Sequence, residues 1–308
     1  MSSQLEPREF VSVVILNYNK VVDLRRNLAA LRQLTTSPGE IIVVDNHSSD
    51  GSAEMVKNEF PEVNLIEMAF NSGVAVGRNA GYRVARGQYI VSLDDDSVCP
   101  PDTIEKTVSI FTQDLSVGCL AYSVRSVPAM TYDCVVSSVK LGNYHGAGHA
   151  FRHSALKQIN YLDEKYFFGA EEIDTSLRLM ESGYITRYTP EIVIDHHVRK
   201  HTGKERYRRM ANWIENWGWF YWKYFPVRYA MLFTLRLVVT YLFVAIKHGT
   251  WLALFRGIGK ITTNLPSVFR VRKVTTPQIV AFYADSNTQP AHFNVSVIVQ
   301  IVKAICPR

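Results

Sequence analysis

The chain has 308 residues, of which 47% are hydrophobic and 20% charged, an ordinary composition for a globular protein. This length is sufficient to bury a sizeable core, either in one large domain with an appendage or in two domains. The net charge of +6 is unevenly distributed, because residues 197–274 hold 15 Lys and Arg residues against two acidic residues, which leaves the first 196 residues acidic. An acidic front and a basic rear indicate two functional parts.

The cysteines exclude a disulfide-rich framework and a cysteine-based metal site. The four of them are scattered without metal-type pair spacing, which suits a reducing cytosol; they are Cys99, Cys119, Cys134 and Cys306. The first seven residues contain no basic stretch followed by an apolar core, so we expect no secretory signal.

Apolar, β-branched runs alternate with helical segments from residue 10 to residue 93. We expect strands at 10–16, 41–44, 63–67 and 89–93, with helices at 21–34, 53–59 and 76–85 between them. Strands that alternate with helices at this spacing predict an α/β fold with a parallel, doubly wound sheet. Neither a P-loop motif nor Gly-x-Gly-x-x-Gly follows the first strand, which argues against a P-loop NTPase and a dinucleotide enzyme.

Three consecutive carboxylates, Asp94, Asp95 and Asp96, end the fourth predicted strand. Ligands of open α/β sheets bind beyond the carboxyl ends of the strands. Adjacent carboxylates repel each other unless a positive group lies among them, and Mg²⁺ or Mn²⁺ takes oxygen ligands that it shares with substrate phosphates. A solvated acidic turn is the alternative, and these three residues alone leave both interpretations open.

Further polar residues are expected at the same edge of the sheet. Asp45 ends the second strand, where a buried carboxylate can accept a hydrogen bond from a base or a ribose. Asn71, Arg78 and Asn79 are candidates for contact with a diphosphate beside a helix N-terminus. Taken alone, a plain turn explains Asp45 equally well, and a solvated helix face explains Arg78.

Four segments resemble, in order, successive signatures of the family-2 glycosyltransferases, and most of all those of the bacterial rhamnosyl- and galactofuranosyltransferase-like members. The segments are 11–19, 41–52, 71–81 and 93–97, and the similarity runs from about residue 11 to residue 197. The resemblance implies the GT-A fold, a nucleotide-diphospho-sugar transferase fold of Rossmann type. It also implies an inverting transfer from a nucleotide diphosphate sugar, such as a UDP- or dTDP-sugar.

The resemblance also implies roles by position. Asn17, Tyr18 and Asp45 would hold the nucleotide base and ribose, with Asn19 in the same nucleotide-sugar site. Asp95 would contact the ribose or the donor sugar. Asp94 and Asp96 would hold the metal, Mn²⁺ or Mg²⁺.

A cluster of acids, Glu171, Glu172 and Asp174, opens a predicted helix, where the macrodipole favours negative charge. An inverting transfer needs a base that deprotonates the acceptor hydroxyl opposite the leaving group. The resemblance assigns this role to the second member of the acid pair, Glu172. The family's usual residue there is Asp, so the longer side chain keeps Glu171 as the alternative. We expect Asp174 to serve the helix or to position the acceptor.

A strand at 188–195 ends in two histidines. The family's pattern of proline, apolar strand and histidine falls on His196, so the resemblance implies that His196 completes the metal shell. His197 is the fallback, and a purely structural histidine is the alternative.

After residue 198 the composition becomes aromatic and basic. We therefore divide the chain into a GT-A domain over 1–198, with the nucleotide-sugar and acceptor sites, and a mainly helical region over 199–308. Aromatic rings and long basic side chains suit the headgroup layer of a membrane. Residues 229–246 hold a single charge and reach the lower length limit of a spanning helix, but we favour a position on the membrane.

A plain helical bundle core is the alternative to membrane contact, and the apolar composition argues against nucleic-acid binding. Residues 277–308 are expected to be loosely structured, with a strand at 295–302.

These features together predict a metal-dependent inverting glycosyltransferase that adds single sugars to a glycan or lipid-linked acceptor in bacterial cell-surface polysaccharide synthesis. We expect it on the inner-leaflet surface, at the cytoplasmic face of the inner membrane, or in the cytoplasm. The lack of a Gln-x-x-Arg-Trp motif disfavours a processive synthase. Two further alternatives are a sugar-phosphate nucleotidyltransferase, which would need a glycine-rich first loop, and a non-catalytic membrane-bound adaptor, which would not need the acid pair. The donor sugar, the acceptor and the oligomeric state do not follow from the sequence.

Overall fold

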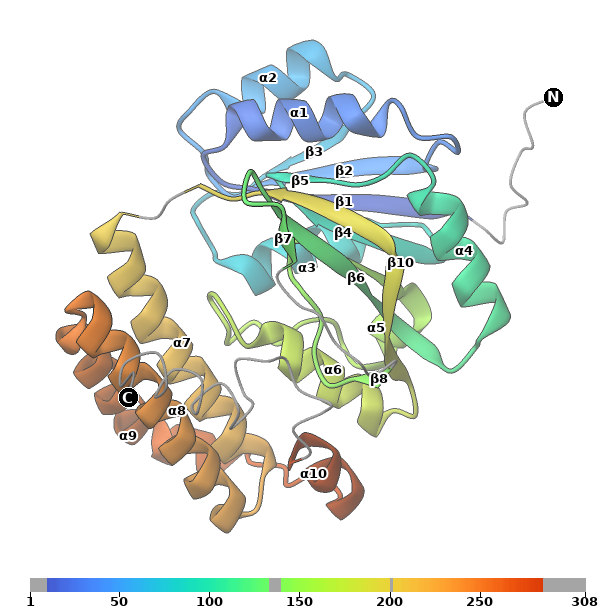
Figure 1. The fold of residues 1–308 in the computed structure, drawn as a ribbon. Helices are drawn as coiled ribbons and strands as arrows, with labels where there is room; N and C mark the ends of the chain where they lie inside the picture. The colour runs from blue at the N-terminus through green and yellow to red at the C-terminus, as the bar shows by residue number, and fades with distance from the viewer. Residues whose placement is uncertain (1–9, 133–139, 200–201, 285–308) are drawn as a thin grey trace.

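The computed structural model describes residues 10–132, 140–199 and 202–284, and one mixed sheet forms its centre (Figure 1). Strands β1 (Val11–Asn17), β2 (Glu40–Asp45), β3 (Asn64–Glu67) and β4 (Tyr89–Asp94) are parallel, in the order β3-β2-β1-β4. Helices α1 (Val21–Leu31), α2 (Ser52–Glu59) and α3 (Val74–Val84) connect them. The predicted alternation of strands and helices is therefore confirmed for this half, and no end differs from its prediction by more than three residues.

The second half of the sheet is not parallel throughout. Strand β9 (Gly148–Arg152) lies antiparallel between β4 and β6 (Val117–Val127), and β10 (Ile185–His197) runs parallel to β6. The short strands β5 (Ser97–Val98), β7 (Thr131–Tyr132) and β8 (Lys140–Leu141) pair with the outer strands. The parallel, doubly wound arrangement predicted from residues 10–93 therefore holds for β1 to β4, and the second half of the chain adds β9 to the sheet as an antiparallel strand. The sequence also predicts a strand at 132–139, and its residues beyond Tyr132 lie outside the described part of the chain.

Each face of the sheet buries its own core, because successive side chains of a strand point to opposite faces. Val11, Val13 and Ile15 of β1 pack with α1, α2 and α4 (Thr103–Gln113). Val14 and Leu16 pack on the other side with α3, α5 (His153–Gln158) and α6 (Glu171–Glu181).

The C-terminal region is helical, as predicted. Helices α7 (Gly203–Tyr224), α8 (Val227–His248) and α9 (Trp251–Val271) lie together beside the sheet, and α7 packs against both of the others (Figure 1). Helix α7 begins with a capping box, in which Thr202 accepts from the Glu205 N–H and the Glu205 carboxylate accepts from the Thr202 N–H.

The chain continues into a further helix, α10 (Pro277–Ala284). Its residues Ile279, Val280 and Tyr283 are buried in the core beneath α6, and the Tyr283 hydroxyl donates to the Gly142 carbonyl oxygen at 2.8 Å. The expectation of loose structure from residue 277 is therefore wrong for 277–284. The expected strand at 295–302 lies outside the described residues.

A buried carboxylate joins α6 to α7. Asp174 is fully buried and accepts hydrogen bonds from Arg178 on its own helix (2.6 Å) and from Tyr224 on α7 (2.8 Å). The Lys223 ammonium lies 3.2 Å from the same carboxylate. Asp174 thus fastens the acid-bearing helix to the C-terminal region, and its full burial contradicts a direct contact with an acceptor.

Candidate active site

The register of the parallel strands brings the predicted polar residues to one edge of the sheet. Asn17, the last residue of β1, is paired with Asp45 of β2, and its neighbour Leu16 is paired with Asp94 of β4. The predicted nucleotide residues and the acid triplet therefore lie side by side at the carboxyl ends of three adjacent strands.

Asp45 is held in a fixed orientation. The Asn17 amide donates to its Oδ1 at 2.7 Å, and the Ser48 N–H donates to its Oδ2 at 2.9 Å. The loop that follows β1 carries Tyr18 and Asn19. The Tyr18 side chain is exposed, and Asn19 has a positive φ of 53° and accepts a hydrogen bond from the Ser49 N–H. The structure thus gathers Asn17, Tyr18, Asn19 and Asp45 around one loop pair at the sheet edge.

Lys20 is a site residue that the sequence analysis missed. Its ammonium lies 3.3 Å from Asp95 Oδ1 and also contacts the Asp96 carboxylate. Burial and the neighbouring carboxylates raise the pKa of Asp95 to about 7, although the charge of Lys20 opposes this. Three adjacent acids require a nearby cation, and a lysine directly after the Asn17–Asn19 loop was the available signal.

A second unpredicted residue, Asn46, shapes the start of α3. Its amide donates to the Gly73 carbonyl oxygen (3.1 Å) and to Asn71 Oδ1 (3.2 Å), while its oxygen accepts from the Ser72 N–H. Asn71 in turn accepts from the Gly73 N–H at 3.1 Å. Asn71 is therefore half-buried and fixed at the N-terminus of α3.

Asp94, Asp96 and His196 form the cluster that the resemblance implied, with one ligand atom from each residue within 4.8 Å of the others. Strand β5 places them together, since it pairs Ser97 with His196 of β10. His196 Nε2 lies 3.3 Å from Asp96 Oδ1. Burial would raise the pKa of Asp96, but the bond with His196 and the charge of Lys20 hold it at about 2.

The chemistry of this donor set fits a hard divalent cation. Two carboxylates supply oxygen ligands of the kind that Mg²⁺ and Mn²⁺ take, and imidazole is tolerated beside them. Strand alternation directs the neighbouring His197 to the other face of β10, which separates the fallback residue from the cluster.

Arg78 is buried rather than on a solvated helix face. It is 1% exposed, and its guanidinium donates to Asp94 Oδ1 and to the Gly146 carbonyl oxygen, both at 2.6 Å. Arg78 therefore orients Asp94 through an ion pair and has no exposed surface for the expected contact with a diphosphate.

The environment of Asn79 also differs from the expected one. Asn79 is fully buried, and its amide exchanges two hydrogen bonds with the backbone of Leu162, at 2.9 and 3.0 Å. Asn79 therefore fastens α3 to the segment before α6, and its burial contradicts the expected contact with a diphosphate.

The acid pair lies near Arg78 and Asp94, and its two members differ in exposure. Glu171 is 2% exposed, and its Oε2 has no hydrogen-bond partner in the described part of the chain, whereas Glu172 is half-buried. Burial raises the pKa of both carboxyls, and the charge of Glu172 raises that of Glu171 further. Glu172 is therefore the more accessible carboxylate of the pair.

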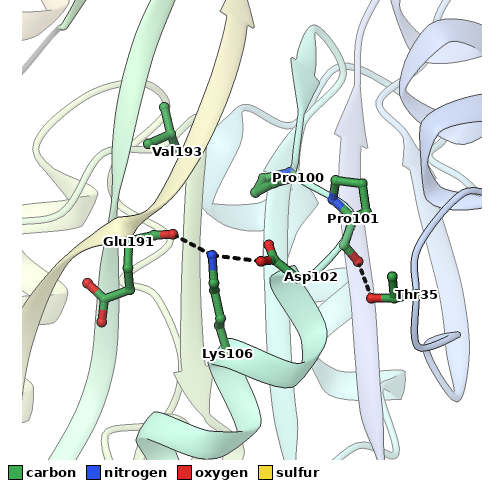
Figure 2. A pocket seen from close by; sticks show the side chains of 7 residues that line it. All are labelled: Thr35, Pro100, Pro101, Asp102, Lys106, Glu191 and Val193. Atoms are coloured by element: carbon green, nitrogen blue, oxygen red, sulfur yellow. Dashed lines mark hydrogen bonds and ion pairs between the residues drawn. The ribbon is translucent and has the colours of Figure 1, made fainter.

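A separate open groove of about 490 Å³ lies around the N-terminus of α4 (Figure 2). Lys106 crosses it, 2.8 Å from the Asp102 carboxylate and 3.0 Å from the Glu191 carbonyl oxygen, so its charge is compensated. The groove shares no residue with the predicted site; its lining comprises Thr35, Pro100, Pro101, Asp102, Lys106, Glu191 and Val193.

Two family descriptions match the sequence. "Glycosyl transferase family 2" matches residues 12–159, and "Glycosyl transferase family group 2" matches residues 89–263. An uncharacterized glycosyltransferase of Haemophilus influenzae is 31% identical over 108 residues, which cover 35% of this chain and 36% of that protein. The chain thus spans about a third of that relative's length.

Two further similarities cover more of the chain. The N-acetylglucosaminyl-diphospho-decaprenol L-rhamnosyltransferase of Mycobacterium tuberculosis is 21% identical over 288 residues, covering 79% of this chain and 86% of that protein. The solved structure of the mannosyltransferase PcManGT from Pyrobaculum calidifontis, in complex with GDP-Man and Mn²⁺, shares the fold. It has a TM-score of 0.59 and 20% identity, and the match covers 91% of this chain and 80% of that one.

Proposed function

The chain belongs to glycosyl transferase family group 2, and we propose that it is a metal-dependent, inverting enzyme that transfers one sugar from a nucleotide diphosphate sugar. One observation carries this proposal. The cluster of Asp94, Asp96 and His196 lies at the same sheet edge as the half-buried carboxylate Glu172, with Arg78 and Asp94 near both members of the acid pair.

In this proposal the nucleoside occupies the edge beyond β1 and β2. Asp45, oriented by Asn17 and Ser48, accepts from the base or the ribose, and Tyr18 offers an exposed ring beside it. Asp95 faces the ribose or the donor sugar. A UDP- or dTDP-sugar is the proposed donor.

Asp94, Asp96 and His196 would hold Mn²⁺ or Mg²⁺. When bound, this cation supplies compensation for the negative charge that develops on the departing diphosphate. Arg78 keeps Asp94 oriented through its 2.6 Å ion pair, and Lys20 offsets the charge of Asp95 and Asp96.

Glu172 acts as the base. Its carboxylate takes the proton of the acceptor hydroxyl, whose oxygen then bonds to the anomeric carbon while the bond from that carbon to the diphosphate oxygen breaks. Attack from the face opposite the leaving group inverts the anomeric configuration. Glu171, which is more buried and so less accessible to an acceptor hydroxyl, is the less suitable base.

The acceptor is proposed to be a glycan or a lipid-linked glycan, since the rhamnosyltransferase relative is named for a diphospho-decaprenol substrate. Helix α8 supports a membrane position. It is apolar enough to cross a membrane by length and composition, and only 22% of its most apolar stretch is buried.

We propose that α8 lies on the membrane rather than crossing it. It packs antiparallel along α7, with Thr234 bonded to Trp222 near one end and His248 3.5 Å from Arg206 at the other. Because α7 carries several charged residues along its length, a spanning α8 would draw these charges into the hydrocarbon. The proposed location is the cytoplasmic face of the inner membrane.

Transfer by Glu172→Gln and Glu171→Gln variants tests the catalytic assignment. Loss of a general base costs roughly 10²–10⁴-fold, so Glu172→Gln should lose kcat by that factor while it still binds nucleotide. Glu171→Gln should keep most of the rate. The raised pKa of Glu172 predicts that wild-type transfer falls on acidification at a pH above about 4.3, the ordinary glutamate value. Wild-type rates in Glu172→Gln would place the base elsewhere, and a wild type without nucleotide-sugar turnover would favour the adaptor.

A further inference from the structure

The C-terminal region holds an arginine beside the loop that precedes the acid pair, and the inference drawn from it rests on the proposed function. The Arg209 guanidinium on α7 lies 4.2 Å above the centroid of the Phe168 ring. Phe168 belongs to the loop directly before α6, three residues before Glu171. Arg209 is thereby held next to the segment that presents the acid pair.

This position is fixed by the packing of α7 on the same loop. The Asn216 amide donates to the carbonyl oxygens of Phe168 (2.9 Å) and Gly169 (3.0 Å). Gly169 has a positive φ of 82°, and a Cβ there would lie 2.6 Å from Trp213 Nε1. Only a glycine therefore allows this close approach, which sets α7, and Arg209 with it, against the loop.

The charge of Arg209 is not compensated by an ion pair in the described part of the chain, and its side chain is exposed. The other cations of the site are engaged, since Lys20 pairs with Asp95 and Asp96 and Arg78 pairs with Asp94. Partial desolvation lowers the pKa of Arg209, whereas the charges of Asp94, Glu205 and Asp96 act in the opposite direction and favour its charged form. An exposed guanidinium therefore lies beside the loop that precedes the acid pair, within electrostatic range of Asp94 and Asp96.

We propose that Arg209 binds the diphosphate of the nucleotide donor and stays bound to it as it leaves. A divalent cation is largely neutralised by its two carboxylate ligands, so the charges of the diphosphate require a further cation. A guanidinium suits this role because its planar donors bind phosphate oxygens in a bidentate manner. The transfer site then includes both regions of the chain, and residues 1–198 alone do not complete it.

The test compares Arg209→Ala and Arg209→Lys with Arg208→Ala in the full chain. Arg208 is the neighbouring exposed arginine, which makes it a matched control. Calorimetric affinities for UDP, dTDP and the bare nucleosides, with Mn²⁺ present, separate the phosphate contact from the nucleoside contact. Arg209→Ala should weaken diphosphate binding roughly 10- to 100-fold and leave nucleoside binding unchanged. Arg209→Lys should recover part of the loss, and Arg208→Ala should match wild type.

Three outcomes would overturn the inference. Unchanged diphosphate affinity in Arg209→Ala removes the contact, and an equal loss in Arg208→Ala reduces it to general electrostatics. A variant that alters only the KM of a lipid diphosphate acceptor assigns Arg209 to the acceptor instead of the donor. A wild-type chain that binds no nucleoside diphosphate would overturn the proposed function itself, so the two failures are distinguishable.

Discussion

Asp94, Asp95 and Asp96 are chemically identical and adjacent in the chain, yet each carboxylate has a different environment. Asp94 is partly exposed and paired with the buried Arg78. Asp95 is buried beside Lys20 and accepts from the Tyr18 N–H at 3.0 Å, with a pKa raised to about 7. Asp96 is bound by Lys20 and His196, which keep its pKa at about 2. Asp96 therefore stays ionised to lower pH than Asp95, and it is the carboxylate of the metal cluster that His196 also contacts.

Asp96→Asn should weaken metal-dependent nucleotide binding while the protein stays folded. Removing a ligand should cost at least the roughly 10–100-fold in metal affinity that the loss of an outer-shell partner costs. Titration of Mn²⁺ in the presence of UDP or dTDP, followed by thermal unfolding, measures this effect. Asp102→Asn is the matched control, because Asp102 is a nearby carboxylate paired with Lys106 in the separate groove. Equal affinities in wild type and Asp96→Asn would remove Asp96 from the site.

Some of these residues could be predicted from the sequence and others could not. The shared position of the residues that end the strands could be predicted, because parallel register alone brings Asn17, Asp45 and Asp94 to one edge of the sheet. The burial of Arg78 could not be predicted, since it depends on the approach of the Gly146 backbone from a segment distant in the sequence. Gly146 is so close that a Cβ there would lie 3.0 Å from Glu172 Oε1.

At the scale of elements, the structure depends on the joint between α6 and α7. Asp174 opens α6 beside the acid pair, and Lys223 and Tyr224 close α7. The fully buried carboxylate binds Arg178 in its own helix and both of these α7 residues. This joint fixes the distance between the acid pair and the C-terminal region.

Asp174→Asn should destabilise the protein by roughly 3–5 kcal/mol, because removal of one member of a buried charge network leaves the others uncompensated. Asp163→Asn, which alters a partly exposed partner of Lys223, should cost less than about 1 kcal/mol. Denaturant unfolding of both variants measures the difference. The pKa of Asp174 is lowered in the folded state, so its contribution is present above about pH 3.9 and is lost as the pH falls through the folded pKa. Similar costs for the two variants would show that the joint carries no special weight.

The elements themselves were predictable where the local pattern decides them. Strands β1 to β4 and the helices between them follow from apolar runs and turn residues, which need no knowledge of distant contacts. Helix α10 was not predictable in this way, because Ile279, Val280 and Tyr283 gain their stability from a core formed by α6 and distant loops. Likewise, the antiparallel insertion of β9 is decided by tertiary pairing rather than by its five residues.

At the scale of the whole molecule, the three helices α7, α8 and α9 have two different sides, one packed on the sheet domain and one turned to solvent. Helix α7 faces the sheet domain through Trp213 and Asn216, whereas α8 and the start of α9 turn large apolar side chains to solvent. Exposed apolar residues on α8 include Val227, Met231, Leu235, Leu242 and Ile246. Their four- and seven-residue spacings place them on one face of the helix. Basic residues flank this face, with Arg228 near the start of α8 and Lys247 near its end.

This face predicts binding to anionic membranes, which a double substitution can test. Met231→Glu together with Leu235→Glu should lower the affinity for vesicles with anionic lipid more than tenfold, because each buried apolar side chain contributes roughly 1.5–3 kcal/mol. Flotation with vesicles, at low and high salt, measures the affinity; since the basic flanks add electrostatic attraction, wild-type binding should weaken at high salt. Leu115→Glu is the control, because Leu115 is an exposed leucine just after α4, a helix that lies across the sheet from α7, α8 and α9 (Figure 1). Unchanged vesicle binding in the double variant would contradict membrane binding by this face of α8. If the wild type instead forms a concentration-dependent dimer that the double variant abolishes, the partner of this face is a second copy of the chain.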